Sequence, residues 1–372
     1  MVGGGQGAFI GAVHRMAARL DDKWELTAGV FQSDPKHSRE FGRSLGLAED
    51  RCYGDFADMA SAEAKRTDRI DAVSIVTPNH LHVPVARVFV AAGLPVICDK
   101  PLGISAKDVK ALSSAVRRAG IPFIVTHTYS GYPMVRQARA MIEAGELGKI
   151  RVVQVEYAQD WLANDLPENK QADWRGDPER AGPGGALGDI ATHAFHLAEF
   201  VTGLKASALS ADLSTFVEER KVDDNAHVML RYVDGAKGML WASQVAAGEA
   251  NGLRLRIFGE RAGLEWEQET PETLTITKLG HPAHILRRGG PGLSAAAIAA
   301  TRLPAGHPEG YLEAFAQIYS DAAELIHAHL EVRAPEGFAA LAPGVEDGVR
   351  GVQFIEAAIQ SHAHNSAWTE IS

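Results

Sequence analysis

The chain has 372 residues and the composition of an ordinary globular protein, with 46% hydrophobic and 23% charged residues, so its length predicts two domains that each bury a core. Its 37 basic and 47 acidic residues give a formal net charge of -10, which, without a Lys/Arg cluster, argues against nucleic acid as a partner. The sequence also lacks an apolar run long enough to cross a bilayer, so we expect no membrane partner.

The first 126 residues alternate short apolar runs with helical stretches, which is the pattern of a doubly wound parallel sheet built from βαβ units. Met1 and Val2 run directly into glycines where the body of a first strand is expected. We interpret them as the tail of that strand and predict no signal peptide; either the protein extends upstream or the numbered chain begins late. Further strands are predicted at residues 24–31, 72–76, 96–98 and 123–126, with helices between them, for example at residues 10–20 and 83–92.

A glycine-rich loop follows the first strand. Gly3, Gly5 and Ala8 fit the pattern G-x-G-x-x-A, in which the backbone approaches a pyrophosphate and helix N-terminal amides bind it. Taken alone the pattern is a weak indicator, and a glycine-rich turn without a ligand is the alternative. The predicted dinucleotide contacts in this loop are Gly3, Gly5, Gly7, Ala8, Phe9 and Ile10.

The second strand ends without the carboxylate that usually holds the adenosine ribose. Gln32 and Ser33 are neutral, and Lys36 and Arg39 lie nearby, so a 2'-phosphate would not be repelled. Asp34 is interpreted as the cap of the next helix. The choice between NAD and NADP stays open, with Gln32, Ser33 and Lys36 as predicted cofactor contacts.

Polar residues also follow the next strand. Thr77, Pro78 and Asn79, with His82 beyond them, can line the nicotinamide half of a cofactor groove, and a simple turn with a helix cap is the alternative. We predict all four as cofactor contacts.

Lys100 follows the strand at residues 96–98, between Asp99 and Pro101. A solvated lysine is the alternative, but Pro101 fixes the chain just after Lys100 and aims its side chain from a rigid strand end toward the ligand edge of the sheet. Asp99 and Lys100 are predicted cofactor contacts, and Lys100 is also a predicted catalytic residue.

From residue 127 the pattern changes to that of a mainly antiparallel sheet covered on one face by helices. Residues 233–235 indicate a hairpin turn, and residues 289–306 a loop with a short helix. The sequence therefore predicts a dinucleotide-binding domain at residues 1–126 and an α+β substrate domain at residues 127–372. The predicted strands are residues 151–157, 226–232, 237–243, 253–258 and 274–277, and the predicted helices are residues 134–143, 189–202, 311–329 and 345–362.

Asp189 and His193 lie four residues apart, a spacing that stacks them on one face of a helix, where the carboxylate can orient the imidazole or stabilise its charge. An exposed helical pair is the alternative. The small residues Gly184, Gly185 and Gly188 before them indicate that something packs closely against this helix start. We predict Asp189 and His193 as catalytic residues.

Aromatic and amide residues gather in two segments that could bind a polyol, because sugar hydroxyls need planar hydrogen-bonding groups and sugar C–H faces stack on rings. Buried core aromatics are the alternative for any one of them. The predicted substrate residues are His127, Tyr129, Trp161, Trp174 and Arg175.

Taken in order, the glycine loop, Thr77-Pro78-Asn79-His80-Leu81-His82, Asp99-Lys100-Pro101 and the segment from Gly184 to His193 resemble the Gfo/Idh/MocA family of sugar and cyclitol dehydrogenases. The resemblance spans nearly the whole chain, including later segments that begin at Gly310 and Asp347. Two departures are that Asp99 replaces the family's glutamate and that the glycine loop is longer than usual.

The resemblance implies an N-terminal Rossmann domain and a C-terminal domain whose open sheet forms a homodimer or homotetramer interface. It also implies a nicotinamide cofactor, NAD or NADP with NAD favoured. In this family's pattern His193 takes the hydroxyl proton, Lys100 hydrogen-bonds the reacting oxygen, and Asp189 positions the substrate or His193.

These observations predict an NAD(P)-dependent dehydrogenase of a sugar, cyclitol or sugar derivative. Two alternatives share the fold, namely a redox-neutral enzyme that cleaves glycosides with transiently used NAD, and a non-enzymatic dinucleotide sensor. The two cysteines, Cys52 and Cys98, favour a cytoplasmic location and give no disulfide or zinc pattern, so no metal site is predicted.

Overall fold

The computed structural model describes residues 1–164, 166 and 169–372, and these form two compact units. The first consists of Met1–Thr128 and Phe315–Val349, and the second of Tyr129–Ala314 and Arg350–Ser372. The predicted boundary between residues 126 and 127 lies close to the first break, whereas the return of Phe315–Val349 to the first unit has no counterpart in that prediction.

The first unit is built around a parallel sheet with the strand order β1 (Val2–Gly3), β2 (Val73–Val76), β3 (Val96–Cys98) and β4 (Phe123–Val125). Strands β3 and β4 are buried at every position, as expected for a parallel sheet covered on both faces. The predicted parallel sheet is confirmed, and the two predicted helices begin and end within one residue of α1 and α4. The helices of this part of the chain are α1 (Phe9–Leu20), α2 (Pro35–Ser44), α3 (Phe56–Glu63), α4 (His82–Ala91) and α5 (Ala106–Ala119).

The predicted strand at residues 24–31 is wrong. Only Gly29 and Val30 form isolated bridges there, with Cys52 and Val2. A strand needs a ladder of backbone partners, and β1 offers only two residues beside this segment. The Trp24 indole instead donates to the backbone oxygen of Tyr319 at 2.9 Å. The prediction for Asp34 is confirmed, since its carboxylate accepts the His37 amide at 2.8 Å and caps α2.

The second unit contains a nine-stranded sheet in which β5 runs parallel to β8 and every other pairing is antiparallel. This confirms the predicted, largely antiparallel sheet, and Gly235 takes a φ of +88° in the predicted turn between β7 and β8. In sheet order the strands are β12 (Ala283–Arg287), β11 (Thr273–Lys278), β10 (Ala262–Glu267), β9 (Gly252–Gly259), β5 (Ile150–Ala158), β8 (Lys237–Ser243), β7 (Asn225–Tyr232), β6 (Ala206–Ser214) and β13 (Thr369–Glu370).

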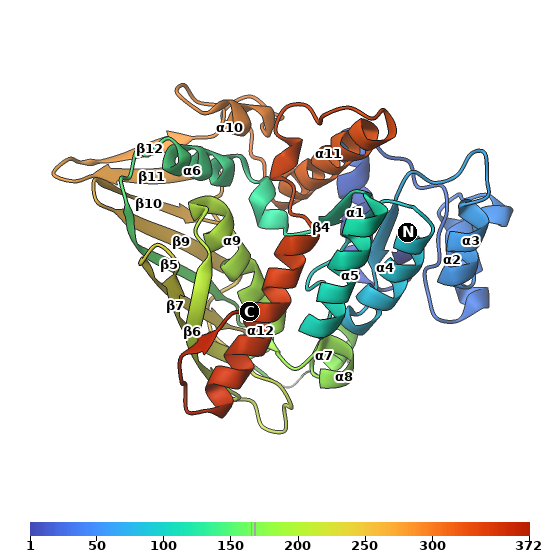
Figure 1. Ribbon diagram of the computed structural model, residues 1–372, viewed down its shortest axis with the longest axis horizontal. Coiled ribbons are helices and arrows are strands. Elements are labelled where there is room, and N and C mark those ends of the chain that lie inside the picture. The colour runs from blue at the N-terminus through green and yellow to red at the C-terminus, as the bar shows by residue number, and fades with distance from the viewer. Residues whose placement is uncertain (165, 167–168) are drawn as a thin grey trace. The chain divides into compact units, whose positions relative to one another are not determined.

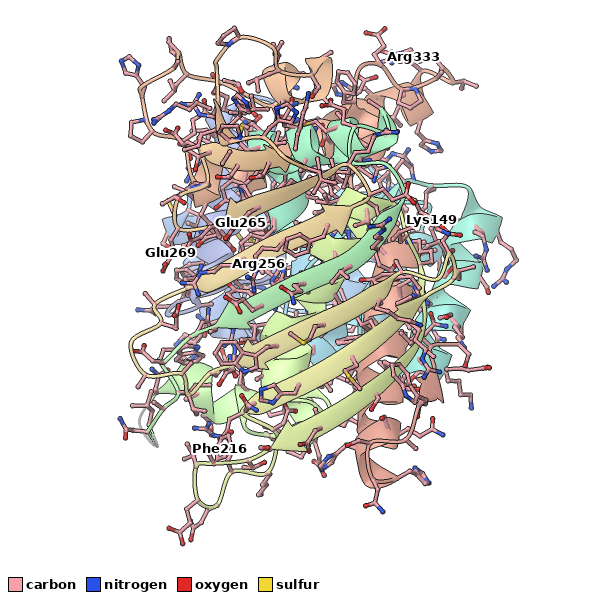
Figure 2. All side chains as sticks on the ribbon, turned by 90° about the vertical axis from the view of Figure 1, so that its left-hand side faces the viewer. Lys149, Phe216, Arg256, Glu265, Glu269 and Arg333 are labelled. Carbon is pink, nitrogen blue, oxygen red and sulfur yellow. The ribbon has the colours of Figure 1, made fainter. Side chains whose placement is uncertain are left out.

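Helices α6 and α9 pack on one face of this sheet (Figure 1). Figure 2 shows the other face, where the side chains of Arg256 and Glu265 extend outward from the strands. Exposed apolar side chains on these strands include Val152, Met229, Met239 and Phe258. The helices are α6 (Pro133–Glu143), α7 (Lys170–Arg175), α8 (Pro178–Ala181), α9 (Thr192–Thr202) and α10 (Ala295–Ala299), while α11 (Tyr311–Leu330) and α12 (Val345–Ala363) contribute residues to both units.

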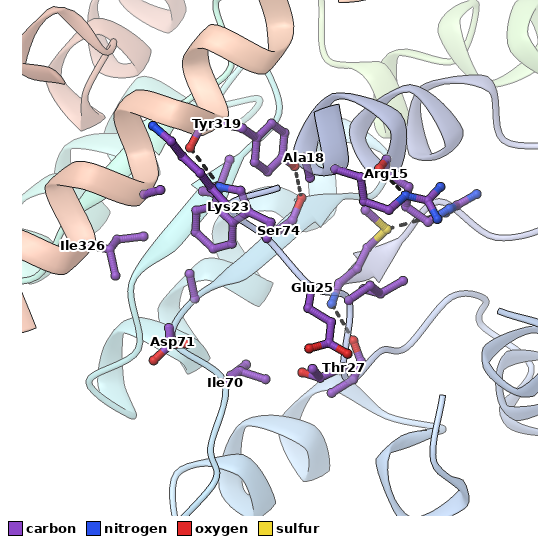
Figure 3. Close-up of a pocket in the computed structure, with 18 of the residues that line it drawn as sticks. Arg15, Ala18, Lys23, Glu25, Thr27, Ile70, Asp71, Ser74, Tyr319 and Ile326 are labelled. Carbon is purple, nitrogen blue, oxygen red and sulfur yellow. Dashed lines mark hydrogen bonds between the residues drawn. The ribbon is translucent and has the colours of Figure 1, made fainter. Parts of the chain in front are cut away.

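A cavity of about 640 Å³ lies in the first unit beside residues that precede or begin β2, such as Ile70, Asp71 and Ser74 (Figure 3). Because these residues lie toward the amino end of β2, the cavity is at the opposite edge of the sheet from the predicted ligand side. Among the described helices, none is long and apolar enough to span a membrane. Within the same described residues, no three His, Cys, Asp or Glu side chains are grouped so that they could hold a metal ion.

Burial of His196 on α9 is expected to make stability depend on pH. Burial, together with the charges of Lys205 and Arg139, lowers the pKa of His196 from its ordinary value near 6.5 to about 3. Below pH 6.5 the unfolded chain therefore binds a proton that the folded protein does not bind until about pH 3. As the pH is lowered through this window, the free energy of unfolding should therefore fall by about 1.4 kcal/mol for each pH unit. Urea unfolding of the wild type and of His196→Gln checks this, and equal pH slopes in the two proteins would contradict it.

Candidate active site

The glycine loop of the first unit is shaped by close backbone packing. A Cβ at Gly3 would lie 2.7 Å from the Val76 oxygen, and one at Gly5 would lie 2.5 Å from the Phe31 oxygen. Gly7 has a φ of +79° with open space around its Cα. Ala8 provides no side-chain cap for α1, so the first amides of this helix receive no cap from it. A loop that is exposed at Gln6 and Gly7 and leads to such a helix start fits the pyrophosphate of a dinucleotide.

Gln32, Ser33 and Lys36 follow Phe31 next to this loop, and the side chain of Gln32 lies near Gly5. Ser33 and Lys36 are exposed. The structure therefore places neutral and basic groups at the position predicted to face the adenosine ribose, and the only nearby carboxylate among these residues, that of Asp34, is engaged in capping α2.

His82 joins two of the predicted cofactor-binding segments. Its Nε2 lies 2.8 Å from the Thr77 oxygen and its Nδ1 lies 2.7 Å from the Pro101 oxygen. The ring is 1% exposed, and burial lowers its pKa. A neutral imidazole has one N–H and can donate to only one of these two oxygens, so in either tautomer the buried ring lies between the Thr77 and Pro101 segments.

Asp99 and Lys100 lie at the carboxyl end of β3, where parallel sheets bind their ligands. Asp99 Oδ1 accepts the Lys100 amide at 2.9 Å and the Thr126 hydroxyl at 2.8 Å. Although burial acts to raise the pKa of Asp99, interactions with His14, Lys100 and His82 hold it below its usual range. The Lys100–Pro101 peptide bond is cis. The lowered pKa keeps the Asp99 carboxylate ionised, and its hydrogen bond to the Lys100 amide fixes the turn that carries Lys100.

In the second unit, Asp189 lies in η4 (Leu187–Ala191), a π-helical turn that leads into α9 and His193. The segment between the two residues is therefore not a regular α-helix, which the predicted stacking assumed. Asp189 Oδ2 accepts Arg175 Nε at 3.0 Å and Gln244 Nε2 at 2.9 Å. The Arg175 guanidinium also lies over the Trp174 ring at 4.4 Å. Asp189 thus binds an arginine and an amide, and the arginine in turn lies over an aromatic ring.

The π-helical turn is held by Asp223, which the sequence did not indicate. Its carboxylate oxygens accept the Gly185 and Leu187 amides, each at 2.7 Å. Burial raises the pKa of Asp223 to about 6, against the effect of these two amides. A Cβ at Gly185 would lie 1.9 Å from the Asp223 backbone oxygen, which explains the glycine at this position.

The His193 ring is 8% exposed and packs edge-to-face on Tyr129, with ring centroids 4.8 Å apart. The Tyr129 and Tyr157 hydroxyls share a short hydrogen bond. The Tyr157 hydroxyl in turn donates to Asn251 Oδ1 at 2.8 Å, and this oxygen also accepts Gln159 Nε2 at 2.7 Å. Trp161 Nε1 donates to Gln159 Oε1 at 3.0 Å, so the network reaches a second predicted substrate residue.

Two groups of predicted residues therefore come together, one in each unit. The glycine loop, Gln32, the Thr77 segment, Asp99 and Lys100 belong to the first, as does the buried His127. Tyr129, Trp161, Trp174, Arg175, Asp189 and His193 belong to the second. The meeting of Lys100 with His193 remains a prediction.

Gln244 and Asn251 were missed by the sequence analysis. One signal could have indicated Gln244: it directly follows β8, just as Gln159 directly follows β5. These two strands are parallel neighbours with Ala158 opposite Ser243, so their next residues lie at the same sheet edge. The sequence gives no comparable signal for Asn251, because its partners come from other loops and strands.

Two family models match the chain. Residues 1–127 match the oxidoreductase family with an NAD-binding Rossmann fold, and residues 135–265 match the GFO/IDH/MocA C-terminal domain. Together they match more than half of the chain and a large part of each unit.

Individual relatives match over the full length. The uncharacterized oxidoreductase YfiI of Bacillus subtilis is 38% identical, with 100% of this chain and 95% of the relative covered. Levoglucosan dehydrogenase of Pseudarthrobacter phenanthrenivorans is 30% identical, with 100% and 97% covered. Among solved structures, an inositol dehydrogenase homolog from Azotobacter vinelandii, complexed with NAD+, has a TM-score of 0.93 at 38% identity, with 100% of this chain and 96% of that chain covered.

Proposed function

Because the chain belongs to the Gfo/Idh/MocA oxidoreductase family, we propose that it is an NAD-dependent dehydrogenase of a sugar, cyclitol or sugar derivative. It transfers a hydride between the nicotinamide and a secondary hydroxyl or the matching ketone. The observation that carries this proposal is the polar and aromatic cluster around Asp189 and His193, in a chain that also holds a lysine at the carboxyl end of a Rossmann strand.

The proposed roles follow from the chemistry of each group. His193 accepts the hydroxyl proton of the substrate, because a neutral imidazole is a base near physiological pH. Lys100 donates a hydrogen bond to the reacting oxygen and stabilises its negative charge. Asp189, held by Arg175 and Gln244, orients the substrate or His193. The nicotinamide, when bound, supplies the hydride acceptor.

Several features support a polyhydroxylated substrate. Gln159, Gln244 and Asn251 provide planar amides, and Trp161 and Trp174 provide ring faces on which sugar C–H groups stack. Relatives of this chain are named for levoglucosan and for inositol, which are a sugar derivative and a cyclitol. NAD is proposed over NADP because solved relatives hold NAD+ or NADH, although Gln32 and Ser33 leave room for a 2'-phosphate.

The test is turnover with a panel of sugars, cyclitols and anhydrosugars, followed by the absorbance of the reduced nicotinamide at saturating NAD or NADP. We expect reduction of NAD by at least one polyol and a higher kcat/KM for NAD than for NADP. Absence of any turnover in both directions would overturn the proposal. Release of sugar from a glycoside with no net change in absorbance would instead identify the redox-neutral alternative.

We also propose that the chain forms a homodimer or homotetramer in the cytoplasm. The exposed Val152, Met229, Met239 and Phe258 on the outward face of the second unit's sheet support a contact between copies, because exposed apolar groups on one face of a sheet favour association. The molar mass measured by light scattering tests the oligomeric state.

A further inference from the structure

A buried series of polar side chains in the first unit connects α11 with the turn that carries Lys100. The Tyr319 hydroxyl lies 2.7 Å from His14 Nδ1 and 2.9 Å from Ser74 Oγ. His14 is fully buried and Tyr319 is 3% exposed. Figure 3 shows Tyr319 and Ser74 together at the wall of the cavity described above. The three residues come from α1, β2 and α11 and belong to none of the sequence motifs that indicated the cofactor site.

Either hydroxyl can donate in the Ser74–Tyr319 contact, and the role of His14 Nδ1 depends on the tautomer of the ring. One direction uses both hydroxyl protons within the series: the Ser74 hydroxyl donates to the Tyr319 oxygen, and the Tyr319 hydroxyl donates to a neutral His14 at Nδ1. Burial raises the pKa of Tyr319 above its usual range, so its hydroxyl keeps the proton that it donates. A neutral imidazole has one N–H and one acceptor nitrogen. With Nδ1 accepting, the proton of His14 is on Nε2.

This tautomer presents an N–H to the carboxylate of Asp99. His14 Nε2 lies 3.9 Å from Asp99 Oδ2, beyond hydrogen-bond length but close enough for electrostatic attraction. The other carboxylate oxygen accepts the Lys100 amide and the Thr126 hydroxyl. The groups that act on this carboxylate are therefore His14 from α1, Lys100 beside it, and His82 from α4. The orientation of the Asp99 carboxylate therefore depends on whether His14 Nε2 carries a proton.

We propose that His14 and Tyr319 are positioning residues for Lys100, with Tyr319 selecting the His14 tautomer whose Nε2–H faces Asp99. The role assigned to Lys100 rests on the proposed function. This arrangement gives a physical reason for the return of Phe315–Val349 to the first unit, since that segment supplies Tyr319 and also Phe315, whose ring packs on His14 at 4.6 Å.

Removal of the Tyr319 hydroxyl should reverse the tautomer. In Tyr319→Phe, His14 Nδ1 loses its donor, and a proton on Nδ1 can then be shared with Ser74 Oγ, which lies 3.4 Å away. The Nε2 lone pair then faces the Asp99 carboxylate and repels it, unless Nε2 also takes up a proton. Activity of this variant should therefore be lower than that of the wild type, because the carboxylate that fixes the turn of Lys100 is displaced.

The experiment combines histidine side-chain 15N NMR with kinetics on the full chain. The His14 signal is assigned as the one lost in His14→Gln. We expect an Nε2–H tautomer in the wild type, and an Nδ1–H or doubly protonated ring in Tyr319→Phe. The kcat of Tyr319→Phe should fall about tenfold relative to the wild type, with KM nearly unchanged.

The matched control is Trp24→Phe, which removes the indole bond to the Tyr319 backbone but leaves the hydroxyl series in place. It should keep both the wild-type tautomer and the wild-type kcat. An Nδ1–H tautomer in the wild type would overturn the proposal, and so would a Tyr319→Phe variant with an unchanged tautomer and kcat. If no polyol is turned over, the proposed function fails, while the NMR result still decides the tautomer that Tyr319 selects.

Discussion

Replacement of His193 by asparagine or of Lys100 by methionine is expected to lower kcat for the best polyol about 10²–10⁴-fold. His193→Asn removes the base that accepts the hydroxyl proton while keeping a polar side chain of similar size. Lys100→Met keeps an unbranched side chain that is one atom shorter and removes its charge, so the developing oxyanion loses its hydrogen-bond donor. The measurement is steady-state kinetics at saturating cofactor, with cofactor affinity measured separately by quenching of protein fluorescence.

Two surface substitutions of the same kind serve as controls. Lys107→Met and His281→Asn change exposed residues outside both groups of site residues and should leave kcat within about twofold of the wild type. If His193→Asn or Lys100→Met retained nearly full kcat, the assignment of that residue as catalytic would be wrong. If only KM rose, the residue would bind substrate equally in the ground and transition states.

The second large effect is expected for Gly185→Ala at the start of the π-helical turn. The new Cβ would lie 1.9 Å from the Asp223 backbone oxygen, a distance that neither backbone can accept without moving. Such a movement would weaken the hydrogen bonds that the Gly185 and Leu187 amides donate to the Asp223 carboxylate. These bonds hold the turn that carries Asp189. We expect a loss of about 2–4 kcal/mol in stability, together with a large loss of activity.

Gly188→Ala is the matched control because it adds the same methyl group three residues later, where the nearest atom, Ile355 Cδ1, is 3.9 Å away. This distance is ordinary van der Waals contact, so stability should change by less than about 1 kcal/mol. Thermal unfolding of the two variants and the wild type provides the comparison. Equal melting temperatures for Gly185→Ala and Gly188→Ala would show that the close approach to Asp223 does not constrain the turn.

The sequence correctly predicted those helices and strands that are indicated by residues within or next to the element itself. The strand at residues 96–98 and the helices α1, α4 and α6 were found within about one residue, because periodic apolar residues and flanking Gly or Pro report directly on the backbone. The failure at residues 24–31 has the opposite cause: those residues suit a strand, but strand formation depends on partners elsewhere in the chain.

For the candidate site, sequence patterns were enough to identify the residue types at strand and helix ends, namely the glycine loop, Asp99 with Lys100, and Asp189 with His193. Their partners could be identified only from the folded arrangement. Asp189 is bound by Arg175 and Gln244, and Asp99 is faced by His14, whose Nδ1 lies 2.7 Å from the hydroxyl of Tyr319, 305 residues further along the chain. Such contacts are set by the packing of distant elements, and local periodicity carries no information about them, because it reports only which face of an element is buried.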